Sequence, residues 1–157
     1  MYYIIVDIDG TIVDNNHRVH LIPLTDKDNP HAWVDFNNAC LADEPIQYVI
    51  DQVKYLYQEI KEAKLVFITS RCLSARTAST MQLMDHFGLY PYSLLMRPMD
   101  NRLSPADYKK EVLYTLLSPD DAGIIFDDHP DVIKMVKDHY LNLIPVFIDS
   151  QCCSVTK

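Results

Sequence analysis

Five short apolar runs divide the chain and predict the strands of one sheet. They span 2–8, 65–68, 93–96, 122–126 and 144–148. Each is a nearly continuous stretch of aliphatic and aromatic residues. Such runs are typical of strands buried on both faces, whereas a strand with one solvated face alternates between apolar and polar residues. The pattern therefore favours a parallel sheet that is covered by helices on both sides.

Helical patterns lie between these runs. Four helices are predicted, at 45–62, 74–87, from 105 to about 117, and at 130–139. Pro45 stands where the first should begin, Gly88 where the second should end, and Ser104 where the third should be capped. Strands that alternate with helices predict a doubly wound, Rossmann-like α/β fold. We expect one domain over 1–150 and a loosely held tail at 151–157.

One long segment follows neither pattern. Residues 12–44 are rich in asparagine, proline and aspartate, with one short helical candidate at 33–40. The segment is too short for a large inserted domain. We therefore expect a small flap over whatever site the sheet carries.

Two carboxylates come directly after the first apolar run, in Asp7-Ile8-Asp9-Gly10-Thr11. Residues i and i+2 of a strand point the same way, so Asp7 and Asp9 should project together from its carboxyl end. Like charges at close range are unfavourable unless a cation or a shared proton lies between them. The pair therefore indicates a site that holds a nucleophile, an acid or base, and a divalent metal.

Polar groups also follow the other predicted strands. In a doubly wound sheet, ligands bind beyond the carboxyl ends of the strands. The residues at those ends are Thr69, Ser70, Arg71, Arg97, Asp127 and Asp128. Carboxylates suit magnesium, and hydroxyl and guanidinium groups suit phosphate oxygens. Together they favour a phosphate site with a metal.

Composition narrows the class of protein. The 157 residues carry a net charge of −8, which argues against a broad basic surface that grips duplex DNA. Cys40, Cys72, Cys152 and Cys153 show no metal-ligand spacing, so free thiols are expected. No run is long enough to span a membrane, and the first strand starts at residue 2, so no signal peptide is expected. These features predict a soluble, cytoplasmic protein, and no P-loop motif for a kinase is present.

The motifs resemble those of the haloacid dehalogenase-like phosphatase superfamily. Asp7-Ile8-Asp9-Gly10-Thr11 looks like its first motif, and Phe67-Ile68-Thr69 like its second. A lysine in a helix, Lys109 or Lys110, fits the third, and Phe126-Asp127-Asp128 fits the fourth. The spacing from Arg97 favours Lys109. The resemblance covers nearly the whole chain.

A narrower resemblance is to the phosphatase half of phage-type polynucleotide kinases. It rests on Thr69-Ser70-Arg71, Met96-Arg97-Pro98 and the paired acids at 127–128. Ser70 replaces a glycine of that group. Pro105 stands where those enzymes often carry an acid four residues before the lysine, and Asp107 is the nearby acid that could take its place.

The resemblance implies a mechanism with an aspartyl-phosphate intermediate. Asp7 would be the nucleophile, Asp9 the acid and base, and Thr69 and Lys109 the ligands of the transferring oxygens. Mg²⁺ would be held by Asp7, Asp127, Asp128 and the backbone carbonyl of Asp9. Arg71 and Arg97 would bind substrate, together with Gly10, Thr11 and Ser70; the alternative for each arginine is an ion pair with a neighbouring acid. Thr11 would orient Asp9, and Arg18 and Arg102 are weaker candidates. Apart from the resemblance, Trp33 and Tyr92 could stack a base, although aromatic residues at such spacing more often belong to the core.

Three functions follow from this interpretation. The first is removal of 3′-phosphates from nucleic-acid ends, because of the arginine pattern and the small flap. The second is a nucleotidase or small-molecule phosphatase, which the net acidity favours. The third is a phosphate-binding regulatory module without turnover, against which the presence of both Asp7 and Asp9 argues. The substrate is thus expected to be a phosphorylated nucleic-acid end or a nucleotide.

Overall fold

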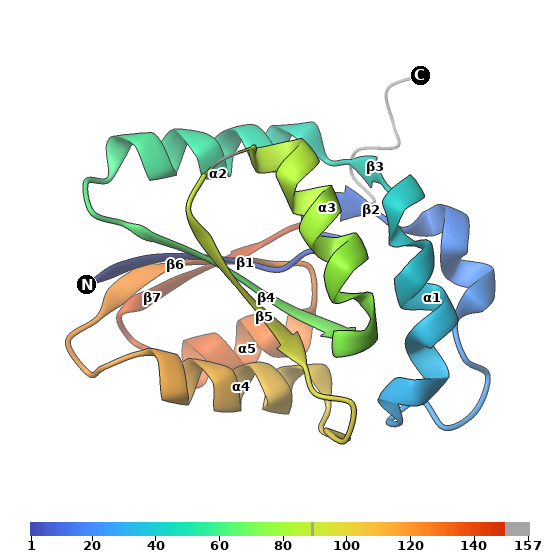
Figure 1. Cartoon of the computed structure of the whole chain (residues 1–157). Coiled ribbons are helices and arrows are strands. Elements are labelled where there is room, and N and C mark those ends of the chain that lie inside the picture. Colours follow the sequence, from blue (N-terminus) through green and yellow to red (C-terminus); the bar gives the residue numbers. More distant parts are fainter. Residues whose placement is uncertain (89, 150–157) are drawn as a thin grey trace.

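The computed structural model describes residues 1–88 and 90–149 and contains one five-stranded parallel sheet (Figure 1). The strand order is β5-β4-β1-β6-β7. The strands are β1 (Tyr2–Val6), β4 (Lys64–Cys72), β5 (Tyr92–Arg97), β6 (Ala122–Asp127) and β7 (Leu143–Phe147). The predicted parallel α/β sheet is confirmed, and each predicted strand is present with its bounds shifted by a few residues.

The first strand occupies the centre of the sheet and sets the register of the site. Val6 lies opposite Phe67 of β4 and Phe126 of β6. The hydrogen bond from the Asp7 backbone N–H to the Phe126 carbonyl, 2.9 Å, continues this pairing one residue further. The parallel register therefore brings Asp7 level with the end of β6, whose last residue is Asp127 and after which Asp128 follows.

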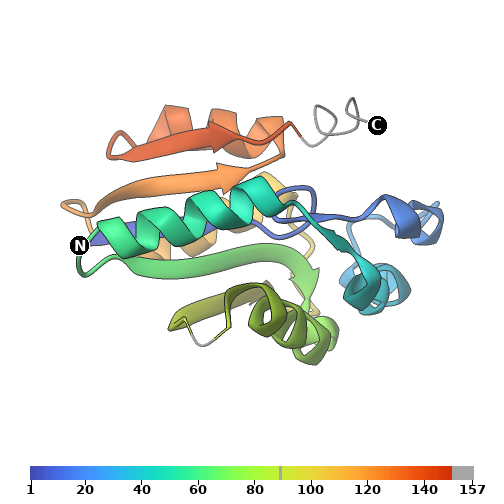
Figure 2. The same cartoon turned by 90° about the horizontal axis from the view of Figure 1, so that it is seen from above.

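Helices cover both faces of the sheet (Figures 1 and 2). Helices α2 (Gln47–Glu59) and α3 (Arg76–Phe87) cover one face, and α4 (Pro105–Leu116) and α5 (Pro130–His139) cover the other. Successive residues of β1 point to opposite faces, so Ile4 packs in the first core and Ile5 in the second. Both are completely buried, as a sheet between two helical layers requires.

The predicted helix ends are mostly confirmed. Gly88 closes α3 with a φ of 63°, and its N–H donates to the Met84 carbonyl at 2.8 Å. The Ser104 hydroxyl accepts from the Asp107 N–H and caps α4. The expectation for Pro45 was wrong, because α2 begins two residues later. Glu44–Pro45 instead forms a short strand, β3, antiparallel to β2 (Val13–Asp14).

The segment predicted as a flap lies between β2 and β3, beyond the carboxyl ends of the sheet strands (Figures 1 and 2). Its elements are the 3-10 helices η1 (Asn16–Leu21), η2 (Pro30–Trp33) and η3 (Ala39–Ala42), and the short helix α1 (Val34–Asn38). The β2–β3 pair joins its two ends at the root. We call residues 13–45 the flap from here on.

Two expectations concern the thiols and the termini. Cys40 and Cys72 are free and buried, as predicted. The tail at 151–157, with Cys152 and Cys153, lies outside the described residues. Across residues 1–88 and 90–149, no helix combines the length and the hydropathy that crossing a bilayer would require.

Candidate active site

A cavity of about 610 Å³ opens at the carboxyl end of the sheet. Residues from the strand ends, the flap, the start of α4 and the 98–104 loop line it. The lining residues include Asp7, Asp9, Lys109 and Asp128, so most of the side chains expected to act as nucleophile, acid or base, phosphate ligand and metal ligand meet in this cavity.

Lys109 forms the centre of a buried charge cluster. Its ammonium nitrogen lies 2.6 Å from a carboxylate oxygen of Asp127 and 2.9 Å from one of Asp7. All three residues are almost inaccessible to solvent, at 2%, 1% and 7% exposure. Lys110, the alternative lysine, instead contacts His139 at 3.0 Å on the other side of α4. The structure therefore places Lys109, and not its neighbour, in the site.

Asp128 completes a group of three carboxylates. Oxygens of Asp7, Asp127 and Asp128 lie within 4.8 Å of one another, close enough to share one cation. Gly10 makes room for this arrangement: a Cβ at Gly10 would lie 2.1 Å from a carboxylate oxygen of Asp128. Its φ of 74° also favours glycine. The glycine after the two acids is thus required by the approach of Asp128.

The charges of this cluster are out of balance. Burial raises the pKa of Asp7 well above its ordinary value, and the carboxylates of Asp127 and Asp128 add to that rise while Lys109 opposes it. Burial and the neighbouring Asp127 raise the pKa of Asp128 to about 6. Burial alone would lower the pKa of Lys109, but Asp127 and Asp7 outweigh it and raise the pKa. One lysine faces three carboxylates, so the group favours a further cation.

Asp9 belongs to a different set of contacts from Asp7. The strand ends at Val6, and the chain then turns, with the Ile8 carbonyl accepting from the N–H groups of residues 11–13. The expectation that Asp7 and Asp9 project together as strand neighbours was therefore wrong in its reason. Both still line the same cavity, but Asp9 pairs with arginines.

Arg71 holds Asp9 with two parallel hydrogen bonds, 3.0 Å from Nε and 2.7 Å from Nη2. Its remaining N–H groups donate to Ser79, Gln82 and Asp43 at 2.8–3.2 Å. Each of the five guanidinium N–H groups thus has an acceptor. Arg71 lines the cavity, but none of its guanidinium donors is free, so its contacts are those of a positioning residue for Asp9. That it binds substrate stays a prediction.

A second arginine, Arg18 of the flap, holds the same carboxylate from the other side. Its Nη2 donates to Asp9 and to Asp43, its Nε donates to Asp43 at 2.7 Å, and its Nη1 donates to the Phe36 carbonyl at 2.9 Å. Arg18 and Asp43 come from opposite ends of the flap. Asp9, Asp43, Arg18 and Arg71 therefore form one buried network at the flap root.

The sequence patterns do not predict this network. From them Arg18 is a weak candidate for substrate binding, and Asp43 has no expected role of its own. An arginine and an aspartate at the two ends of an irregular segment are a signal that could have suggested a contact. The contact itself depends on the β2–β3 pair that brings those ends together.

The network changes the acidity of Asp9. Burial would raise the pKa of this carboxyl, but the charges and hydrogen bonds of Arg71 and Arg18 outweigh burial and leave the pKa lowered. Asp9 is therefore ionised at neutral pH in this arrangement.

Arg97 differs from the other two arginines because it has no carboxylate partner among the described residues. Its side chain is 7% exposed, donates to the Leu103 carbonyl at 2.8 Å and to the Ser70 hydroxyl at 3.3 Å, and lies over the Tyr108 ring. Its buried Nε has no hydrogen-bond partner within residues 1–88 and 90–149. Burial lowers the pKa of this guanidinium. An uncompensated buried cation on the cavity wall is suited to an anionic ligand.

Thr69 and Thr11 lie behind the cavity wall. Thr69 is 1% exposed, and its hydroxyl accepts from the Arg71 N–H at 3.2 Å. The Thr11 hydroxyl is fully buried, and no hydrogen-bond partner for it, Asp9 included, is present in the described part of the chain. Neither Gly10 nor Thr11 lines the cavity. Substrate contact by these two residues stays a prediction; the contact that the structure shows for Gly10 is the room it makes for Asp128.

Pro105 lines the cavity where an acid was expected from the narrower resemblance. Asp107 does not replace that acid. Its carboxylate is exposed and accepts from the Ser104 hydroxyl at 2.6 Å, as part of the helix cap.

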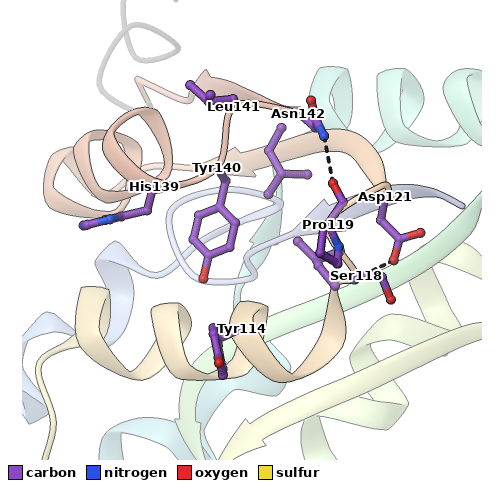
Figure 3. Close-up of a pocket in the computed structure, with 10 residues that line it drawn as sticks. Tyr114, Ser118, Pro119, Asp121, His139, Tyr140, Leu141 and Asn142 are labelled. Atoms are coloured by element: carbon purple, nitrogen blue, oxygen red, sulfur yellow. Dashed lines mark hydrogen bonds between the residues drawn. The ribbon is translucent and has the colours of Figure 1, made fainter.

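A second hollow lies at the opposite end of the sheet (Figure 3). It is lined by Tyr114 of α4 and by residues between α5 and β7, including Tyr140 and Leu141. The dashed line from Asn142 to Pro119 marks a hydrogen bond of 3.1 Å that closes one side. Within residues 1–88 and 90–149, the acidic group that could hold a metal lies in the first cavity, not here.

Comparison with known proteins adds structural likeness. No family model and no curated protein matches the sequence. Among solved structures, the Pnkp1/Rnl/Hen1 complex matches with a TM-score of 0.70 and 19% identity over 94% of this chain. The present chain spans only 45% of the matched chain in that complex.

Two further structures match over most of the chain. The class C acid phosphatase of Bacillus anthracis has a TM-score of 0.58 and 18% identity, and the match covers 95% of this chain and 67% of that one. The haloacid dehalogenase-like hydrolase SP0104 of Streptococcus pneumoniae has a TM-score of 0.59 and 16% identity, covering 90% and 82%. Identities this low establish architecture. The fold of this chain is that of the haloacid dehalogenase-like proteins.

Proposed function

We propose that this chain is a Mg²⁺-dependent phosphomonoesterase that removes 3′-phosphates from nucleic-acid ends through an aspartyl-phosphate on Asp7. One observation carries the proposal: three carboxylates converge around the buried Lys109 at the base of an open cavity. This group combines a nucleophile, a cation for the transferring oxygens and a set of oxygen ligands for a metal.

The residues present fit a magnesium ion. Carboxylate oxygens of Asp7, Asp127 and Asp128 would hold it, with the backbone carbonyl of Asp9 as a further ligand. A hard cation prefers such oxygen ligands, and the raised pKa values of Asp7 and Asp128 show how unfavourable the cluster is without one. When bound, the metal supplies the positive charge that lets a carboxylate approach a phosphate dianion.

The reaction proceeds in two halves. An oxygen of Asp7 attacks phosphorus, the bond to the leaving oxygen breaks, and Asp9 gives that oxygen a proton. A water molecule then transfers a proton to Asp9 as its oxygen attacks phosphorus. The bond to Asp7 breaks, which releases phosphate and regenerates both acids.

The protonation of Asp9 must change between these halves. Arg18 and Arg71 keep it ionised before substrate arrives, which is the form needed to activate water. An incoming phosphate dianion is a like charge and raises the pKa of Asp9, which favours the protonated form needed first. The arginines orient the carboxylate in both steps.

Other groups bind the phosphate that is transferred. The Lys109 ammonium stabilises the charge that spreads over its oxygens. The Thr69 hydroxyl accepts one hydrogen bond from Arg71 and keeps its own proton for donation. Arg97, with its unpartnered Nε, offers a further donor on the cavity wall.

A nucleic-acid end is supported as substrate by three features. The cavity is far larger than one phosphate group requires. The motifs resemble the phosphatase half of polynucleotide kinases, and the Pnkp1 complex is a structural neighbour.

The net charge of −8 favours a second candidate, a nucleotidase or small-molecule phosphatase, which does not need to hold a polyanion.

A substrate panel separates these candidates. Release of phosphate from a 3′-phosphorylated oligonucleotide, a 3′-nucleotide, a 5′-nucleotide and a sugar phosphate is measured with Mg²⁺ and with EDTA. The proposal predicts the highest kcat/KM for the oligonucleotide and no turnover in EDTA. Strong preference for 5′-nucleotides or sugars would favour the second candidate, and phosphate binding without turnover would favour a regulatory module.

A further inference from the structure

The cavity is lined by residues of the strand ends and by residues of the flap. Asp7, Asp128, Lys109 and Arg97 are its charged residues near the sheet. On the flap side, Ile22, Pro30, Trp33 and Phe36 provide an apolar wall, and the polar residues Asn15, Lys27, Asp28 and Asn37 line the cavity beside it. Cavities of roughly 300–1,000 Å³ hold ligands of drug or nucleotide size. At about 610 Å³, the space beyond the reacting phosphate is large enough for a leaving group with an apolar face.

Trp33 is the largest side chain on the apolar wall, and its polar group is already satisfied. Its indole N–H donates to the Lys27 carbonyl at 2.8 Å. Its ring meets Phe36 edge to face, with centroids 5.5 Å apart and planes at 86°. Trp33 is the last residue of the short helix η2, and it is half-buried, so part of its ring is accessible. What remains for a ligand is therefore the carbon surface of the indole.

Phe36 cannot take this role. It is 5% exposed, and the Arg18 guanidinium lies 4.1 Å from its ring centroid, on one of its two faces. Phe36 therefore fixes the orientation of Trp33 and of Arg18, while Trp33 is the aromatic ring that a ligand can reach.

We propose that Trp33 packs against the base of the nucleotide that carries the phosphate and thereby determines specificity for nucleotide ends. This inference rests on the proposed function. Every base has a π-face, so a contact through indole carbon tolerates any base. The hydroxyl groups of a sugar phosphate would instead need polar partners, which the carbon surface of the Trp33 ring does not offer.

The charges around the mouth support contact through the base. Lys27, Asp28 and Arg102 lie at the rim, and Arg102 is paired with Asp26 and Asp28 at 3.3 and 3.0 Å. This rim is of mixed sign on a chain of net charge −8. Attraction to a phosphodiester backbone is therefore weak, and the terminal nucleotide must supply most of the affinity.

The test compares two substrates and three forms of the protein. One oligonucleotide ends in a normal 3′-phosphorylated nucleotide; the other carries its 3′-phosphate on a tetrahydrofuran abasic residue. Wild type, Trp33→Ala and Trp33→Phe are assayed with Mg²⁺. Loss of one stacked base predicts that Trp33→Ala raises KM for the normal end by about tenfold. KM for the abasic end and kcat for both ends should change little, and Trp33→Phe should restore most of the affinity.

Control variants and outcomes separate this inference from a folding defect. Tyr114→Ala removes an aromatic ring that is 83% exposed on α4 and far from the cavity, and it should leave all constants unchanged. Equal rises in KM for both ends, or no rise for either, would overturn the role of Trp33 while leaving the phosphatase intact. Absence of Mg²⁺-dependent release from both oligonucleotides by the wild type would overturn the proposed function and this inference with it.

Discussion

Arg71 donates hydrogen bonds to both carboxylate oxygens of Asp9, at 3.0 and 2.7 Å, and its other guanidinium N–H groups already have acceptors in the protein. The residue expected to face the substrate therefore holds Asp9, the proposed catalytic acid, in this structure. Because the pair is buried, its geometry matters more than its charge alone, and lysine could not reproduce it.

Replacement of Arg71 by lysine tests this positioning role. Arg71→Lys keeps the charge but loses most of five buried hydrogen bonds, so we expect the free energy of unfolding to fall by about 2–4 kcal/mol. Misplacement of Asp9 should lower kcat by about ten- to a hundredfold, while KM stays within about twofold. Urea unfolding and steady-state assays with a small phosphomonoester measure these quantities.

Arg76→Lys on the exposed surface of α3 is the matched control and should change neither the free energy of unfolding nor kcat or KM. A large rise in KM with kcat preserved in Arg71→Lys would show that Arg71 binds substrate after all.

Asp7→Asn should abolish turnover without unfolding the protein. We expect a loss of about a thousandfold or more, because an amide cannot form the aspartyl-phosphate. Burial raises the pKa of Asp7, so its ionised form is unfavourable in the fold at neutral pH. Removing that charge should therefore leave the thermal midpoint in EDTA unchanged or higher.

The exposed Asp51→Asn on α2 serves as the control for this experiment. Activity of Asp7→Asn near the wild-type level would mean that the nucleophile is another group.

Magnesium should stabilise the folded protein through the three-carboxylate cluster. At a hundred times its Kd, a ligand of the folded state adds about 2.7 kcal/mol to the free energy of unfolding. Thermal unfolding with increasing Mg²⁺ should show this rise, and EDTA should reverse it. Asp128→Asn should weaken the response by removing one ligand; an undiminished response would place the metal elsewhere.

The two glycines with positive φ provide a matched pair. Gly10→Ala and Gly88→Ala both place a side chain at φ values of 74° and 63°, and each should lose about 1–2 kcal/mol of stability. A Cβ at Gly88 would meet no atom of the described residues within 4 Å, whereas one at Gly10 would collide with Asp128. Only Gly10→Ala should therefore lose Mg²⁺ affinity, measured by calorimetry. Equal losses of Mg²⁺ affinity in both variants would contradict the conclusion that Gly10 makes room for Asp128.

The sheet was predictable because its strands are buried on both faces. Continuous runs such as Ile4-Ile5-Val6 leave little ambiguity, and caps such as Ser104 and Gly88 mark helix ends by local chemistry. The expectation for Pro45 was wrong because proline occurs both at helix starts and in short edge strands, so the residue alone does not distinguish the two. The pairing of Glu44–Pro45 with Val13–Asp14 depends on a contact across the flap, which no local pattern encodes.

The site was predictable where the sheet register alone sets it. Asp7 follows β1 and Asp127 ends the adjacent parallel strand β6, so their proximity follows from topology. The partners of Asp9 did not follow, because Arg18 and Asp43 reach it only through the folded flap. Arg71 looks the same in sequence whether it meets a phosphate or a carboxylate; the buried acids around it decide which.

The network at the flap root also limits how this fold could be rearranged. Arg18 and Asp43 contribute one charge of each sign to a buried set that includes Asp9 and Arg71. An exchange of the flap for a different insertion would remove both at once and leave Asp9 with half of its cationic support. A new insertion must therefore bring its own arginine and acid to the same place, so the flap and the carboxylate of Asp9 can only be inherited, or redesigned, together.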